Sequence, residues 1–449
     1  MATGPQGSRA WRIVPEAIFL GVILVGLMLD GLYLFHNGYL PPPFVYDTLD
    51  NLMDWYNTAY WANSSGAYDI WGAIYPPLSF VFLRIFSLHS CYYDGPFFGR
   101  DCDWLGKVVL ITFFLLNIVV VFRVYRLKQR ATALVRTLAL CLGLPMVFAL
   151  DRGNLILPCF TAFALAHGRL LKSARLRWLA LALTVNFKPY LIATLVPLLL
   201  RRKWRALEGV AIVGLLVYLV TWAAFGSGSP VEVVANTLLV HQQAVEGGRL
   251  FAGVFYGGSY SSLVAYMTTG LPLMNFVGSR IVEFIDWGPS LSIHIGQLAV
   301  GVSYLAAAFR PHAVTAARLT ALSVALAMST VEVGGYAQVF LLFLVFLEPW
   351  RGPTRIVALL AAYLLCVPLD YLIAGIAHQM QSSYLTGRTV GYDLGVSLGL
   401  FVRPGLILLI EYALATGTLL EALKAGPPRP VPGTPERWPG GPASTPLPA

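Results

Sequence analysis

Long apolar stretches recur along almost the whole chain, from Ile13 to Glu421, and only short polar segments separate them. Only 12% of the residues are charged, roughly half the usual share in a soluble domain. The sequence therefore excludes a water-soluble protein. Because a transmembrane helix needs about 20 mostly apolar residues, it predicts an all-α polytopic membrane protein with about 10 to 12 transmembrane helices. No internal repeat, which is common in transporters, is apparent.

These stretches define one membrane domain, residues 13–425. The first stretch, Ile13 to Phe35, has no small-residue cleavage site after it, so we expect a retained helix and not a cleaved signal peptide. Residues 1–12 are then a cytoplasmic N-terminus. The segment 426–449 is rich in proline and has no apolar period, which predicts a disordered cytoplasmic tail.

Basic residues outnumber acidic ones by 31 to 22, and most of them form short clusters between apolar stretches. Such clusters mark cytoplasmic loops by the positive-inside rule, so the excess predicts orientation in a membrane and no nucleic-acid partner. The expected cytoplasmic clusters are Arg123 to Arg136, Arg169 to Arg177, Arg201 to Arg205, Arg310 to Arg318, Arg351 to Arg355, and Lys424 with Arg429. The expected outer segments are 36–72, 226–286, 332–336 and 376–393.

Two segments do not fit a topology in which successive loops alternate between the two sides of the membrane. The apolar stretch between Arg177 and Arg201 has basic flanks at both ends and Lys188 near its middle. It is either a pair of half-helices that meet at a polar apex or one proline-kinked helix with a snorkelling lysine. The stretch Tyr75 to Leu88 is short and contains an arginine, so it is either re-entrant or evidence that the next basic cluster breaks the charge rule. Cys91 and Cys102 share the polar loop that follows, and they can pair if this loop is extracytoplasmic.

The first loop, residues 36–72, carries aspartates interleaved with tryptophan and tyrosine, which favour the membrane interface. Asp47, Asp50 and Asp54 have helical spacing and are predicted to share one face of a helix. One of them could act as a general base in catalysis. The alternative is that they are ordinary loop and helix N-terminal acids.

A second polar segment, Asp151-Arg152-Gly153-Asn154, separates two apolar stretches. Ionisable residues at membrane depth are candidates for function, and Arg152 together with Lys188 could bind a phosphate group. The alternative is a structural ion pair between Asp151 and Arg152. Two outer segments hold further polar residues, each of which is by itself more typical of a structural role: His241, Glu332 and Tyr336.

The ordered set of short motifs resembles the GT-C glycosyltransferases, most closely glycosyltransferase family 87, whose members use polyprenyl-phosphate sugars. The similarity covers roughly residues 13–350. The motifs that carry it are MDWYNTAYWA, YPPLSF, RGN at 152–154, KPY at 188–190 before RRKWR, and VGGYAQVF at 333–340.

This resemblance implies a GT-C-type helix bundle with interfacial helices in its first extracytoplasmic loop. It also implies inverting transfer of one sugar from a polyprenyl-phosphate donor to a lipid-linked or glycan acceptor, mannosyl transfer among the possibilities. A first-loop aspartate, Asp54 before Asp47 or Asp50, would deprotonate the acceptor. The candidate substrate-binding residues are Tyr56, Tyr75, Arg152, Asn154, Lys188, His241, Glu332 and Tyr336.

Two other functions remain open at this stage: a flippase or transporter for lipid-linked glycans, and a ligase or polymerase of such glycans. No histidine or cysteine cluster has metal-ligand spacing, so no cofactor is predicted, and a divalent metal stays possible. The expected location is the bacterial cytoplasmic membrane, in contact with its lipids and with the active site on the extracytoplasmic side.

Overall fold

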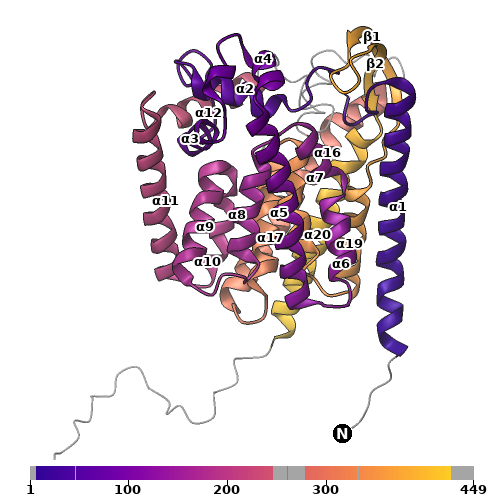
Figure 1. Ribbon diagram of the computed structural model, residues 1–449. Helices are drawn as coiled ribbons and strands as arrows, with labels where there is room; N and C mark the ends of the chain where they lie inside the picture. The colour runs from indigo at the N-terminus through magenta and orange to yellow at the C-terminus, as the bar shows by residue number, and fades with distance from the viewer. Residues whose placement is uncertain (1–6, 46, 246–259, 261–278, 331–332, 426–449) are drawn as a thin grey trace, which may run out of the picture.

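The computed structural model describes residues 7–45, 47–245, 260, 279–330 and 333–425. Helices dominate these residues and run roughly side by side (Figure 1). Five of them are long and apolar enough to cross a membrane, which shows a multi-pass membrane protein. They are α1 (Gly7–Asn37), α5 (Trp104–Lys128), α11 (Trp204–Phe225), α16 (Ser279–Phe309) and α20 (Gly399–Lys424).

The remaining apolar segments are shorter than a membrane span because glycine, proline or polar residues interrupt them. One bent pair passes the length test only when its two helices are counted as one span. Full-length crossings among the described residues are therefore fewer than the 10 to 12 predicted. The bent pair is α6 (Ala133–Cys141) with α7 (Leu144–Asp151), and the shorter elements are α8 (Ile156–His167), α9 (Ala174–Phe187), η2 (Pro189–Leu195), α10 (Val196–Leu200), α17 (Ala316–Thr330), η3 (Gly335–Ala337), α18 (Gln338–Val345) and α19 (Pro353–Cys366).

The segment around Lys188 forms two half-helices. Helix α9 ends at Phe187, Lys188 has an extended backbone, and Pro189 starts η2, where its missing N–H costs no helical hydrogen bond. The start of α9 and the end of α10 lie at the same end of the bundle (Figure 1). Of the two alternatives drawn from the sequence, the polar apex is the one that the fold adopts.

Short elements cover the opposite end of the bundle: α2 (Met53–Asn63), α3 (Pro77–Ile85), η1 (His89–Cys91) and α4 (Pro96–Cys102). Helix α3 is only 9 residues long and stays at this end, so the stretch Tyr75 to Leu88 does not cross the bundle (Figure 1). The polar segment after α1 thus continues past Gly72 to the start of α5. Cys91 and Cys102 form a disulfide, as the loop composition allowed.

One part of the chain departs from the all-α prediction. Residues expected to form an outer loop make an antiparallel hairpin of β1 (Leu372–Ser382) and β2 (Thr389–Ser397). The hairpin lies beside the end of α1 (Figure 1). It is also fastened to the first loop, because the N–H of Tyr384 donates to the carbonyl of Thr48 over 3.0 Å. A hairpin can form here because each strand satisfies the backbone groups of the other.

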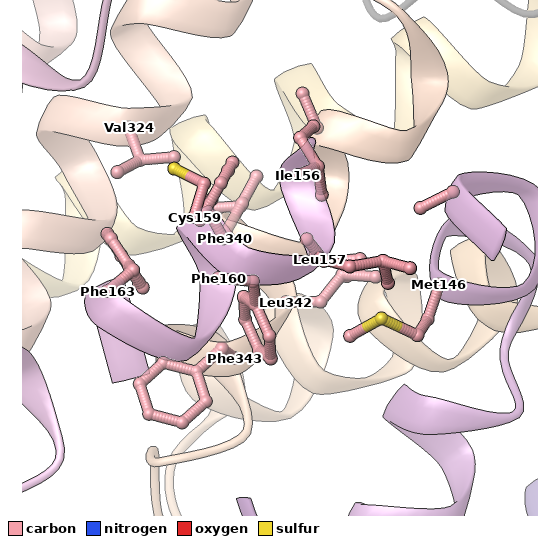
Figure 2. Close-up of a cluster of buried hydrophobic side chains, with 14 of the residues drawn as sticks. Met146, Ile156, Leu157, Cys159, Phe160, Phe163, Val324, Phe340, Leu342 and Phe343 are labelled. Carbon is pink, nitrogen blue, oxygen red and sulfur yellow. The ribbon is translucent and has the colours of Figure 1, made fainter. Parts of the chain in front are cut away.

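The core of the bundle is an aromatic and aliphatic cluster around α8, with α18 and α17 packed against it (Figure 2). Phe160 and Phe163 of α8 have no exposed surface and contact Phe340 and Phe343 of α18 with ring centroids 4.9 to 5.9 Å apart. Such pairs contribute about 0.5 to 1.5 kcal/mol each beyond their burial. This core holds α7, α8 and η3 in place, and these elements carry much of the candidate site.

Candidate active site

The first loop and the junction of α7 with α8 are joined by backbone hydrogen bonds. The N–H of Leu52 donates to the carbonyl of Asp151 over 2.7 Å, and that of Asp54 donates to the carbonyl of Arg152 over 3.0 Å. Gly153 has a φ of +64°, and a Cβ at this position would lie 2.9 Å from the carbonyl oxygen of Leu52. Only glycine combines this backbone conformation with so close an approach. Two segments about 100 positions apart in the chain therefore form one unit.

Side chains from these two segments converge on Asp54, in the first turn of α2. The Asn154 amide donates from Nδ2 to Oδ2 of Asp54 over 2.6 Å, and Nη2 of Arg152 lies 3.4 Å from Oδ1. The same Arg152 nitrogen pairs with Oδ2 of Asp50. The Asp54 side chain keeps 22% of its surface exposed, so a substrate can reach a carboxylate whose orientation is already set.

Asp50 and Asp54 share the guanidinium of Arg152, but burial has the largest effect on the pKa of Asp50. Burial raises the pKa of Asp50 from 3.8 to about 6, and the neighbouring Asp54 adds to this rise while Arg152 opposes it. Asp50 is therefore a carboxyl that titrates close to neutral pH.

The prediction that three aspartates share one helical face is wrong. Helix α2 begins at Met53, so Asp47 and Asp50 lie before it in turns. Oδ1 of Asp47 accepts a hydrogen bond from the N–H of Leu49 over 2.8 Å, a local turn that occupies this side chain. Asp47 is not among the side chains that hydrogen-bond or pair with Asp54, and its role as a base stays a prediction.

Tyr56, another predicted substrate-binding residue, points into the core. Its side chain has no exposed surface, and its hydroxyl donates to the carbonyl oxygen of Asp103 over 2.9 Å. Residues two apart on a helix differ by about 200° in direction, so the face that presents Asp54 turns Tyr56 into the core. Tyr56 anchors α2 to the start of α5, and its predicted role in substrate binding stays a prediction.

A second group of predicted residues surrounds the apex at Lys188. The Lys188 ammonium lies 4.7 Å from the ring centroid of Tyr75 and 6.0 Å from that of Tyr336, within the range of cation–π contacts. Lys188 is buried, and no carboxylate in the described part of the chain pairs with it. Burial raises the pKa of Tyr336, and the charge of Asp54 adds to this rise, so Tyr336 lies near both groups.

Two predicted residues lie outside what the structure describes. His241 belongs to α12 (Glu232–Val245), but its side chain is not among those described. Glu332 falls in the undescribed segment 331–332. Their assignment as substrate-binding residues stays a prediction.

Sequence inspection missed Asn51. Its amide donates from Nδ2 to Oδ1 of Asp151 over 2.7 Å, so Asp151 does not form the exclusive pair with Arg152 that was considered. Nothing in the local pattern distinguishes Asn51 from other loop amides, because its partner lies 100 residues away.

Three or more histidine, cysteine or acidic groups arranged to hold a metal ion do not occur among the described residues. The site instead offers a carboxylate that can accept a proton, amide and guanidinium groups that orient it, and an ammonium that has no carboxylate partner among the described residues. Comparisons with protein-family models, with curated proteins and with solved structures found no match.

Proposed function

We propose that the protein is an integral membrane glycosyltransferase that moves a single sugar from a polyprenyl-phosphate donor to a lipid-linked or glycan acceptor. The observation that carries the proposal is the pairing of two groups in one site. Asp54, a partly exposed carboxylate held by Asn154 and Arg152, and the buried Lys188 ammonium both lie near Tyr336. A base and a cation are the two groups that glycosyl transfer from a phosphate donor needs.

In the proposed step, the acceptor hydroxyl oxygen attacks the anomeric carbon from the side opposite the phosphate. The new carbon–oxygen bond forms as the bond to the phosphate oxygen breaks, and the polyprenyl phosphate leaves with the electron pair. Asp54 takes the hydroxyl proton. Attack from the opposite side inverts the anomeric centre, and general-base assistance of this kind typically accelerates a reaction by about 10² to 10⁴.

Arg152 and Lys188 have different roles in this proposal. Arg152 is already engaged by two carboxylates, so its charge is largely neutralised, and it orients Asp54. Lys188 has no such partner among the described residues and is held between aromatic rings. A buried, uncompensated cation attracts a phosphate group strongly because little water screens it. We assign Lys188 to the donor phosphate.

The proposal places this site on the extracytoplasmic side of a bacterial cytoplasmic membrane. The disulfide Cys91–Cys102 lies at the same end of the bundle as α2, and disulfides persist in oxidising compartments (Figure 1). Two of the basic clusters predicted to be cytoplasmic, Arg169 to Arg177 and Arg201 to Arg205, lie near the starts of α9 and α11, at the other end (Figure 1).

The test is an assay of the purified full-length protein in liposomes with polyprenyl-phosphate mannose, arabinose and glucose as donors and membrane glycolipids as acceptors. We expect one donor to yield a product heavier by one sugar, and Asp54→Asn to reduce the rate at least 100-fold. Asp69→Asn, an exposed carboxylate of the same loop, serves as the matched control and should keep full activity.

Two results would contradict the proposal. One is full transfer activity in a folded Asp54→Asn protein. The other is lipid scrambling or solute uptake in the liposomes without any donor-dependent glycosylation, which would favour a transporter. Addition of a whole glycan chain, seen in the mass of the product, would instead indicate a ligase or polymerase.

A further inference from the structure

A cavity of about 370 Å³ lies between the end of α1, the first loop and the start of the β-hairpin. Its volume falls in the range of sites that bind small organic molecules. None of its lining residues belongs to the candidate active site. The hairpin and the end of α1 that form its walls lie side by side in Figure 1.

All charged residues that line this cavity are aspartates: Asp30, Asp370 and Asp393. Asp370 pairs with Arg403 over 2.7 Å, and Asp393 lies 2.8 Å from a ring nitrogen of His378. The negative charge of the lining disfavours phosphate and other anions, so the cavity is unsuited to a polyprenyl phosphate.

Asp30 differs from the other two aspartates. Its residue surface is only 5% exposed, and its Oδ2 is buried with no hydrogen-bond partner in the part of the chain that the structure describes. An ionised carboxylate buried without a partner is strongly unfavourable, and buried charges in proteins are normally paired. The side chain is therefore either protonated or paired with a cationic donor from outside the chain.

Aromatic rings surround the acidic wall. Tyr33 and Tyr39 meet edge to face at 5.4 Å with their hydroxyls hydrogen-bonded over 2.9 Å, and Tyr39 lies 5.7 Å from the ring of Tyr392. Aromatic faces beside a carboxylate are a recurrent setting for organic ammonium groups. A metal ion is a poorer fit, because no three potential ligand groups of the described residues converge.

We propose that this cavity binds the primary ammonium group of a small organic ligand, with Asp30 as its counter-ion and the tyrosine rings around it. Apolar walls from Leu29, Leu369 and Leu372 accommodate the carbon atoms attached to the nitrogen. The ammonium can come from a lipid headgroup or from a free amine, since both present the same chemistry. The inference is independent of glycosyl transfer, because it uses none of the residues assigned to that reaction.

The test measures thermal unfolding of the full-length protein by tryptophan fluorescence in detergent, with ethanolamine hydrochloride titrated against sodium chloride at equal ionic strength. Ligands that bind only the folded state raise its unfolding midpoint. We expect a saturable rise of about 2 °C or more with ethanolamine, in line with the usual relation of midpoint to binding energy. Asp30→Asn should unfold at a higher temperature without ligand and lose this rise.

Matched variants and a lipid comparison complete the experiment. Asp69→Asn, which removes a carboxylate outside the cavity, should keep the ethanolamine response, and Asp393→Asn should weaken it if Asp30→Asn does not fold. Nanodiscs of phosphatidylethanolamine against phosphatidylcholine distinguish a lipid headgroup from a free amine. Absence of any response to both ethanolamine and phosphatidylethanolamine would overturn the proposal. So would an equal response in Asp30→Asn, or a response to methyl glucoside in place of ethanolamine.

Discussion

The amide of Asn154 donates a 2.6 Å hydrogen bond to the carboxylate of Asp54, although the two residues are separated by 100 positions. The other end of the same amide is also engaged, because its oxygen accepts from the N–H of Ile156 over 2.9 Å. Since the carbonyl oxygen faces the start of α8, the NH₂ group must face Asp54. Asn154 is fully buried, so its orientation is set by the fold before any substrate arrives.

Replacing Asn154 should impair catalysis more than binding. Asn154→Ala removes a hydrogen bond to a charged group, typically about 1.5 to 3 kcal/mol, which corresponds to a loss of roughly 10- to 100-fold. We expect this loss in kcat, with KM changed less than threefold, because Asn154 contacts the base and not the substrate. Steady-state kinetics of the variant, compared with Asn57→Ala on the same helix as Asp54, provide the check. A purely structural Asn154 would lower the unfolding midpoint and leave kcat per folded molecule unchanged.

Arg152 should contribute to stability through its two carboxylates. Arg152→Gln leaves Asp50 and Asp54 facing each other without the shared cation, and we expect a cost of about 1 to 3 kcal/mol, less than for a fully buried pair. Thermal unfolding measures this. The double variant Arg152→Gln/Asp50→Asn should recover much of the loss, because it removes the repulsion. If the double variant recovers no stability, repulsion between Asp50 and Asp54 is not what Arg152 offsets.

Lys188 should affect the binding of the donor and not the stability of the fold. Lys188→Met keeps the length of the side chain and removes the charge, so the donor KM should rise about tenfold. This factor corresponds to about 1.4 kcal/mol, close to the free energy of one charge-assisted hydrogen bond. The unfolding midpoint should stay the same or rise, because no carboxylate of the described residues pairs with this ammonium. Lys203→Met, an exposed lysine at the other end of the bundle, is the control. An unchanged donor KM in Lys188→Met contradicts the assignment.

Asp50 should make stability depend on pH. Burial raises its pKa from 3.8 to about 6, so the folded protein binds this proton more tightly than the unfolded chain does. Stability then falls as pH rises from about 4 to 6, and at pH 7 the ionised group costs about 3 kcal/mol. Asp50→Asn should match the native protein at pH 4 and unfold at a higher temperature at pH 7. A difference between the two proteins that does not vary with pH would be the contrary result.

Several features of this protein follow from the sequence because they are local. The membrane class is set by the length of the apolar stretches, and a proline and a cation in the middle of one of them mark a break at Lys188, although not its form. Arg152 and Asn154, which separate two apolar segments, were identifiable for the same reason, and Asp54 by its place in the aromatic first loop. Burying such groups is costly, so a sequence that retains them sets them apart from their surroundings.

Other features were decided only by packing between distant segments. The sequence could not distinguish Asp54 from Asp47, because the choice depends on where α2 begins and on which carboxylate meets Asn154. The inward direction of Tyr56 depends on Asp103 in the same way. The contact between the β-hairpin and the first loop and the acidic cavity beside Asp30 likewise require segments more than 300 residues apart to meet. Contacts of this range are set by the tertiary fold, because no local preference of the chain encodes which distant partner a polar side chain will find.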